Sequence, residues 1–276
     1  MKFECVALTH KGLHRKNNED AVYCDGWMRN LSTDQPVRVP LSPSPHGIRI
    51  FAVADGLGGH LSGEMASQLV LSRLAETAFG TDEPVESVLT KFIEESHKEL
   101  VELSRATPRH RGMGTTIAGI VVSSIGDVHI FHVGDSRIYR REDRYLQLLT
   151  KDDRPDDGTF GDPESVSNAK SMLLQCVGGV GDLVGIKPHV ERINLGEKPE
   201  VFLLCSDGLS DMIAQDDIEE ALADNHEKTV SSLFDRVCRA GAKDNVSIII
   251  VEVLRDVSPA DDQAAPGGHE TSGVQS

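Results

Sequence analysis

The sequence has few basic residues, few aromatic residues and no closely spaced cysteines. Its 28 lysines and arginines compare with 44 aspartates and glutamates, which gives a formal charge of −16. Nucleic acids are bound mainly through clustered lysine and arginine, so this balance argues against a nucleic-acid-binding protein. The sequence contains no CxxC pair, which would indicate a zinc site or thiol exchange. We therefore expect reduced thiols at Cys5, Cys24, Cys176, Cys205 and Cys238.

Long apolar segments are also missing. The run IIIVEV at 248–253 is far too short to cross a bilayer, and the N-terminal MKFECVALTHKG has no basic stretch followed by an apolar run. We therefore expect a cytoplasmic protein without a membrane segment. A length of 276 residues with 39% hydrophobic content suits one core, so we expect one domain over 1–254. Residues 255–276 have almost no apolar side chains, which predicts a disordered tail.

Short β-like runs dominate the chain, with amphipathic helical patterns between them. Strands are predicted at 4–10, 48–56, 115–124, 128–136, 201–208 and 246–254. Apolar spacing predicts helices at 65–79, 85–101, 216–224 and 227–240, the last capped by Gly241. The strands on either side of Gly126 form a predicted hairpin, and loops are expected at 29–47 and 151–170. Mixed or antiparallel sheets are therefore expected rather than a Rossmann sheet.

Aspartates recur at the ends of the predicted strands. Three apolar runs end in an aspartate next to glycine, at Asp55, Asp135 and Asp207. Asp244 precedes its strand, so it joins the others at one sheet edge if that strand runs antiparallel to 201–206. A single Asp-Gly pair is more often a simple turn, but four aspartates in such positions argue against four unrelated turns.

Carboxylates gathered at one edge require a cation between them. Like charges a few ångströms apart repel, and some of them would otherwise be protonated. Oxygen ligands without cysteine or clustered histidine favour Mg²⁺ or Mn²⁺ over Zn²⁺. The adjacent glycines allow a backbone carbonyl to approach an ion. The pattern therefore predicts a centre for hard divalent ions.

Six ordered segments resemble the protein phosphatase 2C-type, metal-dependent serine/threonine phosphatases, in particular the bacterial single-domain type. They are GLHRKNNEDAV (12–22), ADGLGGHLSGEMAS (54–67), GMGTTIAGIVV (112–122), HVGDSRIYR (132–140), LLCSDGLSD (203–211) and KDNVSIIIV (243–251). The resemblance covers roughly residues 5–254. It implies an α+β fold, a four-layer α-β-β-α sandwich in which two mixed, mostly antiparallel sheets are flanked by helix pairs.

The resemblance also implies a set of site residues. Two Mn²⁺ or Mg²⁺ ions are expected, with direct ligands at Asp20, Asp55, Asp207 and Asp244. The carbonyl of Gly56 would add an oxygen, and Glu19 would act through water. A third ion would be held partly by Asp135 together with Asp207.

Our mechanistic hypothesis is that two ions bridge a water and convert it to hydroxide for in-line attack on phosphorus. Arg15 would bind two phosphate oxygens, the alternative being an ordinary surface arginine beside Lys16. By family matching, His60 would protonate the departing seryl or threonyl oxygen, the alternative being that it only hydrogen-bonds nearby backbone. Phosphorylated proteins are the implied substrates. The resemblance further implies an opposing serine/threonine kinase, and we expect a monomer.

The segment 151–181 departs from the family pattern. Thr150, Lys151, Asp152 and Asp153 stand where Thr-x-Asp-His is usual, which puts substrate choice in doubt.

The alternative function is that of a binding or sensor module that keeps the phosphatase fold with little or no turnover. Loss of a direct ligand would favour it. All four aspartates and the arginine are present. A nucleotide-binding loop or a covalent hydrolase is disfavoured, because no Gly-Lys-Ser/Thr follows the glycines and no G-x-S-x-G occurs.

Overall fold

Two six-stranded sheets form the centre of the computed structural model, which describes residues 1–41, 47–59, 61–80, 83–155, 172–179 and 185–254. The β1 sheet contains, in spatial order, β11 (Tyr145–Leu148), β10 (Arg137–Glu142), β14 (Glu200–Cys205), β15 (Val246–Leu254), β1 (Lys2–His10) and β4 (Val37–Arg38). The β5 sheet contains β13 (His189–Asn194), β9 (Asp127–Val133), β8 (Ile117–Ser123), β5 (Ile48–Ala54), β2 (Ala21–Cys24) and β3 (Trp27–Arg29). A third, small sheet contains β12 (Val177–Gly178), β7 (Gly114–Thr115) and β6 (Gly56–Leu57).

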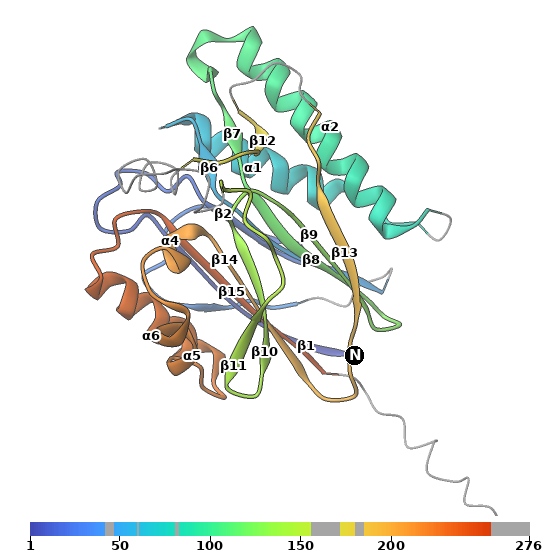
Figure 1. The fold of residues 1–276 in the computed structure, drawn as a ribbon, viewed down its shortest axis with the longest axis vertical. Helices are drawn as coiled ribbons and strands as arrows, with labels where there is room; N and C mark the ends of the chain where they lie inside the picture. The colour runs from blue at the N-terminus through green and yellow to red at the C-terminus, as the bar shows by residue number, and fades with distance from the viewer. Residues whose placement is uncertain (42–46, 60, 81–82, 156–171, 180–184, 255–276) are drawn as a thin grey trace, which may run out of the picture.

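Helices cover both outer faces of the two sheets (Figure 1). On the β5 sheet lie α1 (Leu61–Glu76) and α2 (Val85–Ala106), and a 3₁₀ turn at Pro108–His110 follows them. On the β1 sheet lie α4 (Asp207–Ser210), α5 (Gln215–Glu220) and α6 (His226–Arg239). The layers therefore follow the order helix, sheet, sheet, helix.

Period-two alternation within the strands explains this layering. Along β1, Cys5 and Ala7 belong to the cluster between the sheets, whereas Val6 and Leu8 pack with α5 and α6. Successive side chains of a strand point to opposite faces, so a strand that is apolar throughout serves two cores. Phe51 of β5 is fully buried between the sheets, and its truncation to alanine is expected to cost about 3–5 kcal/mol.

The long helices and the hairpin agree with the predicted pattern. Helix α2 buries residues spaced three and four apart, and α6 does the same. The side chain of Asn225 accepts a hydrogen bond from Lys228 N at 2.9 Å and caps the start of α6. Gly241, at φ 107°, follows the end of this helix, as predicted. Strands β8 and β9 pair antiparallel around Gly126, so the hairpin is confirmed.

Other elements differ from the prediction. Strands β10, β11 and β13 were not predicted. Charged residues interrupt the apolar pattern of β10 and β13, and β11 has only four residues and lies at a sheet edge. The predicted helix at 216–224 is the shorter α5, and 207–210 forms α4. Val37–Arg38, in the predicted loop 29–47, pairs with β1 as β4. No helix of the described ranges has the length and apolar character needed to cross a membrane.

Candidate metal centre

Two antiparallel strand pairs, one from each large sheet, bring four aspartates to the same edge of the sandwich. Asp20 precedes β2 and Asp55 follows β5, and these strands pair with Ala21 opposite Ala54. Asp207 follows β14 and Asp244 precedes β15, and these strands are also antiparallel. In an antiparallel pair, the end of one strand lies beside the start of the other, so each pair delivers two carboxylates to one edge. The predicted antiparallel pairing around Asp244 is confirmed.

Asp20 connects the two sheets at this edge. Its side chain is fully buried, and Oδ2 accepts hydrogen bonds from Ser206 Oγ at 2.8 Å and Ser247 Oγ at 2.7 Å. Both serines belong to the β14–β15 side of the site, next to Asp207 and Asp244. The second oxygen, Oδ1, is also buried and receives no hydrogen bond from the described residues. A buried carboxylate oxygen without a donor is costly unless a cation or water binds it.

A cavity of about 170 Å³ lies among these carboxylates. Its lining includes Arg15, Glu19, Asp55, Gly56, Thr116, Asp135, Arg154, Asp207, Asp244 and Asn245. The main chain is packed closely at this point, since a Cβ on Gly56 would collide with the carbonyl of Gly63 and approach that of Glu19 to 2.6 Å. A Cβ on Gly208 would likewise meet the carbonyl of Asn245. The glycines after the aspartates therefore permit close backbone packing beside the cavity.

Burial and mutual repulsion alter the acidity of the cavity carboxyls. Burial, opposed by its hydrogen bonds, raises the pKa of Asp20 to about 6. Burial and then neighbouring carboxylates, Asp135 foremost, raise the pKa of Asp207 to about 7. The pKa of Asp55 lies well above its usual range because of burial and the charges of Asp20 and Asp207. Burial also raises the pKa of Asp135, although Arg154 opposes the shift. The site thus favours positive charge.

Two neighbours of Asp244 hold the N-terminal segment at the cavity. Arg15 donates from an Nη to Asp244 Oδ2 at 2.6 Å, and about half of its side chain is exposed. Asn245 is buried, accepts a hydrogen bond from Glu19 N at 2.8 Å and donates to the carbonyls of Lys11 and Asn17. The segment containing Arg15 and Glu19 is therefore attached directly to the start of β15.

Asp135 lies at the cavity with a partner that the sequence reasoning missed. Arg154 Nε donates to Asp135 Oδ2 at 2.6 Å, and the same guanidinium reaches Asp207 Oδ2 at 3.2 Å. It also contacts both oxygens of Asp211, at 3.1 and 2.9 Å. Asp211 has a sequence signal, since it stands four residues after Asp207, about one helical turn. Arg154 has none, because its position depends on a loop without periodic pattern.

Other missed residues support the aspartates. Ser206 and Ser247 stand next to motif residues, and Thr116 Oγ1 accepts a hydrogen bond from Asp55 N at 3.1 Å. All three lie within the segments that resemble the family, and this position was the signal that could have found them. His60, the predicted general acid, lies outside the described residues, as do residues 156–171 of the divergent segment.

Among the described residues, two other groups of possible metal ligands lie away from the aspartate cavity. The ligand atoms of His132, Asp153 and His189 lie within 4.8 Å of one another, as do those of Glu4, His226 and Glu252. In the first, His189 Nε2 is 2.9 Å from Asp153 Oδ1 and its ring stacks on His132. In the second, His226 Nε2 is 2.9 Å from Glu252 Oε2. Each group contains a hydrogen-bonded histidine–carboxylate pair.

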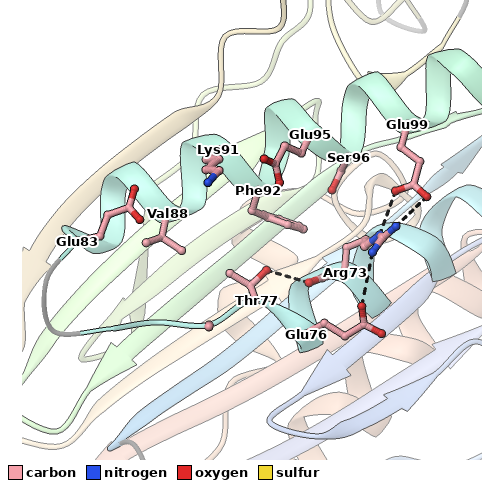
Figure 2. Close-up of a pocket in the computed structure, with 11 residues that line it drawn as sticks. Arg73, Glu76, Thr77, Glu83, Val88, Lys91, Phe92, Glu95, Ser96 and Glu99 are labelled. Atoms are coloured by element: carbon pink, nitrogen blue, oxygen red, sulfur yellow. Dashed lines mark hydrogen bonds and ion pairs between the residues drawn. The ribbon is translucent and has the colours of Figure 1, made fainter.

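A larger cavity of about 450 Å³ lies between α1 and α2 (Figure 2). Figure 2 shows Arg73 of α1 reaching Glu99 of α2, with distances of 3.0 Å from Nε and from an Nη. Thr77 donates to the Arg73 carbonyl at 2.8 Å. The Arg73–Glu99 pair therefore links the two helices at the surface of this cavity.

The aspartate cavity suits divalent ions. Its negatively charged groups are carboxylates, Asp20 Oδ1 is buried without a donor among the described residues, and Gly56 lines the cavity beside Asp55. Mg²⁺ and Mn²⁺ prefer such oxygen ligands. Their positive charge would stabilise the carboxylates and so lower the pKa values that burial and mutual repulsion raise.

Known proteins resemble this chain over most of its length. The sequence model of the family described as "Protein phosphatase 2C" matches residues 42–255. The serine/threonine protein phosphatase PstP of Mycobacterium tuberculosis is 31% identical over 90% of this chain and 45% of that protein, so the chain spans about half the length of this relative. The serine/threonine phosphatase stp of Listeria monocytogenes is 29% identical over 88% of this chain and 93% of that protein.

Solved structures agree with the sequence relatives. A crystal structure of the catalytic domain of PstP in complex with two manganese ions has a TM-score of 0.70 and 29% identity, covering 92% of this chain and 100% of that one. The predicted fold class, an α+β sandwich, is confirmed by this likeness and by the layers described above. The chain therefore belongs to the protein phosphatase 2C family.

Proposed function

We propose that this protein is a metal-dependent phosphatase that hydrolyses phosphoserine and phosphothreonine in other proteins. The observation that carries the proposal is the convergence of Asp20 and Asp55 from the β5 sheet with Asp207 and Asp244 from the β1 sheet at one edge of the sandwich. Asp55, Asp207 and Asp244 line the cavity there, and Asp20 is buried. The names of the relatives, serine/threonine phosphatases, support the reaction type. The two manganese ions of the PstP structure support the cofactor.

The ion ligands are assigned from this geometry. Asp20, Asp55, Asp207 and Asp244 would hold two divalent ions, Mn²⁺ or Mg²⁺, with the Gly56 carbonyl as a further oxygen. Glu19 would act through water. When bound, such ions supply Lewis-acid chemistry that activates water and neutralises phosphate charge. Ser206 and Ser247 fix the orientation of the Asp20 carboxylate, so that its free oxygen Oδ1 is the one available for coordination.

Two further side chains would bind the substrate phosphate and donate a proton. Arg15 lies at the cavity rim, half exposed, with Asp244 beside it, and its planar fork would bind two phosphate oxygens. Hydrogen bonding to Asp244 raises the pKa of Arg15, against burial, which lowers it, so the charge is permanent. His60 would hold the proton that the departing seryl or threonyl oxygen takes up, because a neutral-range imidazole suits that transfer.

The setting of the activity is also part of the proposal. Substrates would be proteins phosphorylated by a serine/threonine kinase, in a signalling role that opposes that kinase. We propose a cytoplasmic monomer with a single catalytic domain over 1–254 and no binding to membranes or nucleic acids. The formal charge of −16 supports the last point. The proposed tail, 255–276, lies outside the described residues.

Hydrolysis of p-nitrophenyl phosphate and of a phosphothreonine peptide tests the proposal directly. The full chain is assayed with Mn²⁺, with Mg²⁺, or with a chelator followed by dialysis. We expect activity with added ion, none after chelation, and recovery when the ion is restored. Hydrolysis that persists after complete chelation would contradict the proposal.

A further inference from the structure

Three consecutive residues of the loop after β11 are attached to the turn between β9 and β10. The Asp152 carboxylate pairs with Arg137 at 2.7 Å. Asp153 N donates to the Gly134 carbonyl at 2.9 Å, and Gly134 N donates to Asp153 Oδ2 at 2.8 Å. The next residue is Arg154. Its guanidinium is therefore positioned by contacts on the loop that precedes it.

These contacts place the Arg154 guanidinium among three carboxylates. Its three nitrogens donate to Asp135, Asp207 and Asp211 over distances of 2.6 to 3.2 Å. Only 14% of the Arg154 side chain is exposed, and the exposed fractions of its partners rise from 6% for Asp135 to 26% for Asp207 and 42% for Asp211. Exposed ion pairs contribute little, but removal of one partner from a buried group leaves an uncompensated charge. The three carboxylates thus form a cation site that this chain fills with its own side chain.

We propose that Arg154 is a tethered cation that occupies the site of Asp135, Asp207 and Asp211 and excludes a further divalent ion from it. The inference rests on the proposed function in one respect, because Asp207 is shared with the proposed two-ion centre. A bound guanidinium leaves that centre its other ligands. A further ion has to displace the arginine first.

A role for Arg154 in phosphate binding fits the contacts less well. Each of its three guanidinium nitrogens already donates to a carboxylate. Arg15, by comparison, is half exposed and contacts one aspartate, so it has donors left for a ligand. The geometry thus separates the two arginines that line the cavity.

Competition between Arg154 and a further ion should lower the apparent affinity for that ion by a measurable factor. If the state with Arg154 withdrawn is populated at about 10% or less, the apparent affinity for a further ion falls at least about ten-fold. Replacement of Arg154 by alanine removes this competition and leaves three carboxylates without a cation. The variant should therefore bind one more ion than the natural chain.

Direct counting of bound Mn²⁺ tests the proposal without any activity assay. The full chain, Arg154→Ala, Arg154→Lys and Arg73→Ala are titrated at pH 8, and the free ion is followed by its electron paramagnetic resonance signal. We expect two ions on the natural chain and on Arg73→Ala, which removes an arginine that pairs with Glu99 in the groove between α1 and α2, away from this loop. We expect three on Arg154→Ala, the third at least about ten-fold tighter than any third event on the natural chain. Adding Asp211→Asn to this variant should return the count to two.

Each outcome decides the matter. Equal counts for the natural chain and Arg154→Ala would overturn the proposal, as would a tight third ion on the natural chain. Circular dichroism checks that each variant is folded. If Arg154→Ala does not fold, Arg154→Lys decides, because lysine keeps the charge but lacks the fork that spans three carboxylates, and we expect a third ion of intermediate affinity. A natural chain that binds no ions contradicts the proposed function, whereas a failed gain in the variants contradicts only the role of Arg154.

Discussion

Two cavities of the described residues, the groove between α1 and α2 and the aspartate cavity, differ in size and, more importantly, in how exposed their charges are. The groove between α1 and α2, about 450 Å³, is the larger, and Arg73 there is half exposed and paired with Glu99 and Glu76 (Figure 2). The aspartate cavity holds only about 170 Å³, and its carboxyls lie beside one another, with Asp135 buried and Asp207 and Asp244 partly exposed. Water screens the charges of the groove, so they need nothing further. The close grouping of carboxyls with raised pKa values, rather than volume, therefore indicates the functional cavity.

The largest effect is expected for Asp207→Asn, which removes one of the four proposed ion ligands of the aspartate cavity. Asparagine has the same shape but cannot supply a charged ligand, so kcat/KM should fall by more than about 100-fold, the upper end seen for residues that only support a ligand. Phosphatase assays with Mn²⁺ and circular dichroism measure the two properties. Near-normal kinetics in a folded variant would refute the assigned role.

Arg15→Ala compared with Lys16→Ala tests which rim cation contacts phosphate. A hydrogen bond to a charged group contributes about 1.5–3 kcal/mol, so kcat/KM should fall by about 10- to 100-fold for Arg15→Ala. Lys16 is exposed and does not line the aspartate cavity, so its variant should behave like the natural chain. Equal losses in both variants would mean that Arg15 acts only through general surface charge.

The His60→Ala variant tests the proposed proton donor through its dependence on the leaving group. The loss should be about 100-fold or more for a phosphothreonine peptide and much smaller for p-nitrophenyl phosphate, whose leaving group needs no proton. Both substrates are assayed at the same Mn²⁺ concentration. Equal losses for the two would indicate a structural role.

Ion binding should be coupled to proton release at the aspartate cavity. The pKa values of Asp20, about 6, and Asp207, about 7, leave part of both carboxyls protonated at pH 6. Ions bind the deprotonated forms, so Mn²⁺ should release protons at pH 6 and almost none at pH 9, and its affinity should fall as pH drops from 8 to 5. Calorimetry in buffers of different ionisation enthalpy counts the protons. A pH-independent affinity over this range would contradict the account.

The smallest effect is expected in the groove between α1 and α2. Arg73→Ala removes an exposed pair with Glu99, so kcat/KM should stay within about two-fold and Tm within about 2 °C of the natural chain. Kinetics and thermal unfolding check both. A loss comparable with that of Arg15→Ala would mean that the larger cavity takes part in the function.

The strand-end positions of Asp55, Asp135, Asp207 and Asp244 were predictable because their signal is local, whereas Asp20 was implied only by the resemblance to the family. Each follows or precedes an apolar run, and antiparallel pairing of neighbouring runs is enough to bring Asp207 and Asp244 together. Strand β13 was not predictable in this way, because its sequence HVERIN has no apolar alternation. It is a strand because it pairs with β9. Its place at the sheet edge depends on a long-range contact.

The position of Arg154 was beyond sequence reasoning for a related cause. It follows from three contacts between the loop after β11 and the turn at Gly134, which join residues 15 to 19 positions apart. No periodicity marks such contacts. A charged residue in an acidic loop appears in the sequence as an ordinary surface residue, and only the fold shows that it reaches Asp135.

Anomalous diffraction from a crystal grown with Mn²⁺ tests the central claim most directly. Data at the manganese absorption edge should show two strong peaks enclosed by Asp20, Asp55, Asp207 and Asp244. If these carboxylates point to separate places and no peak lies between them, the metal centre and the function derived from it are wrong.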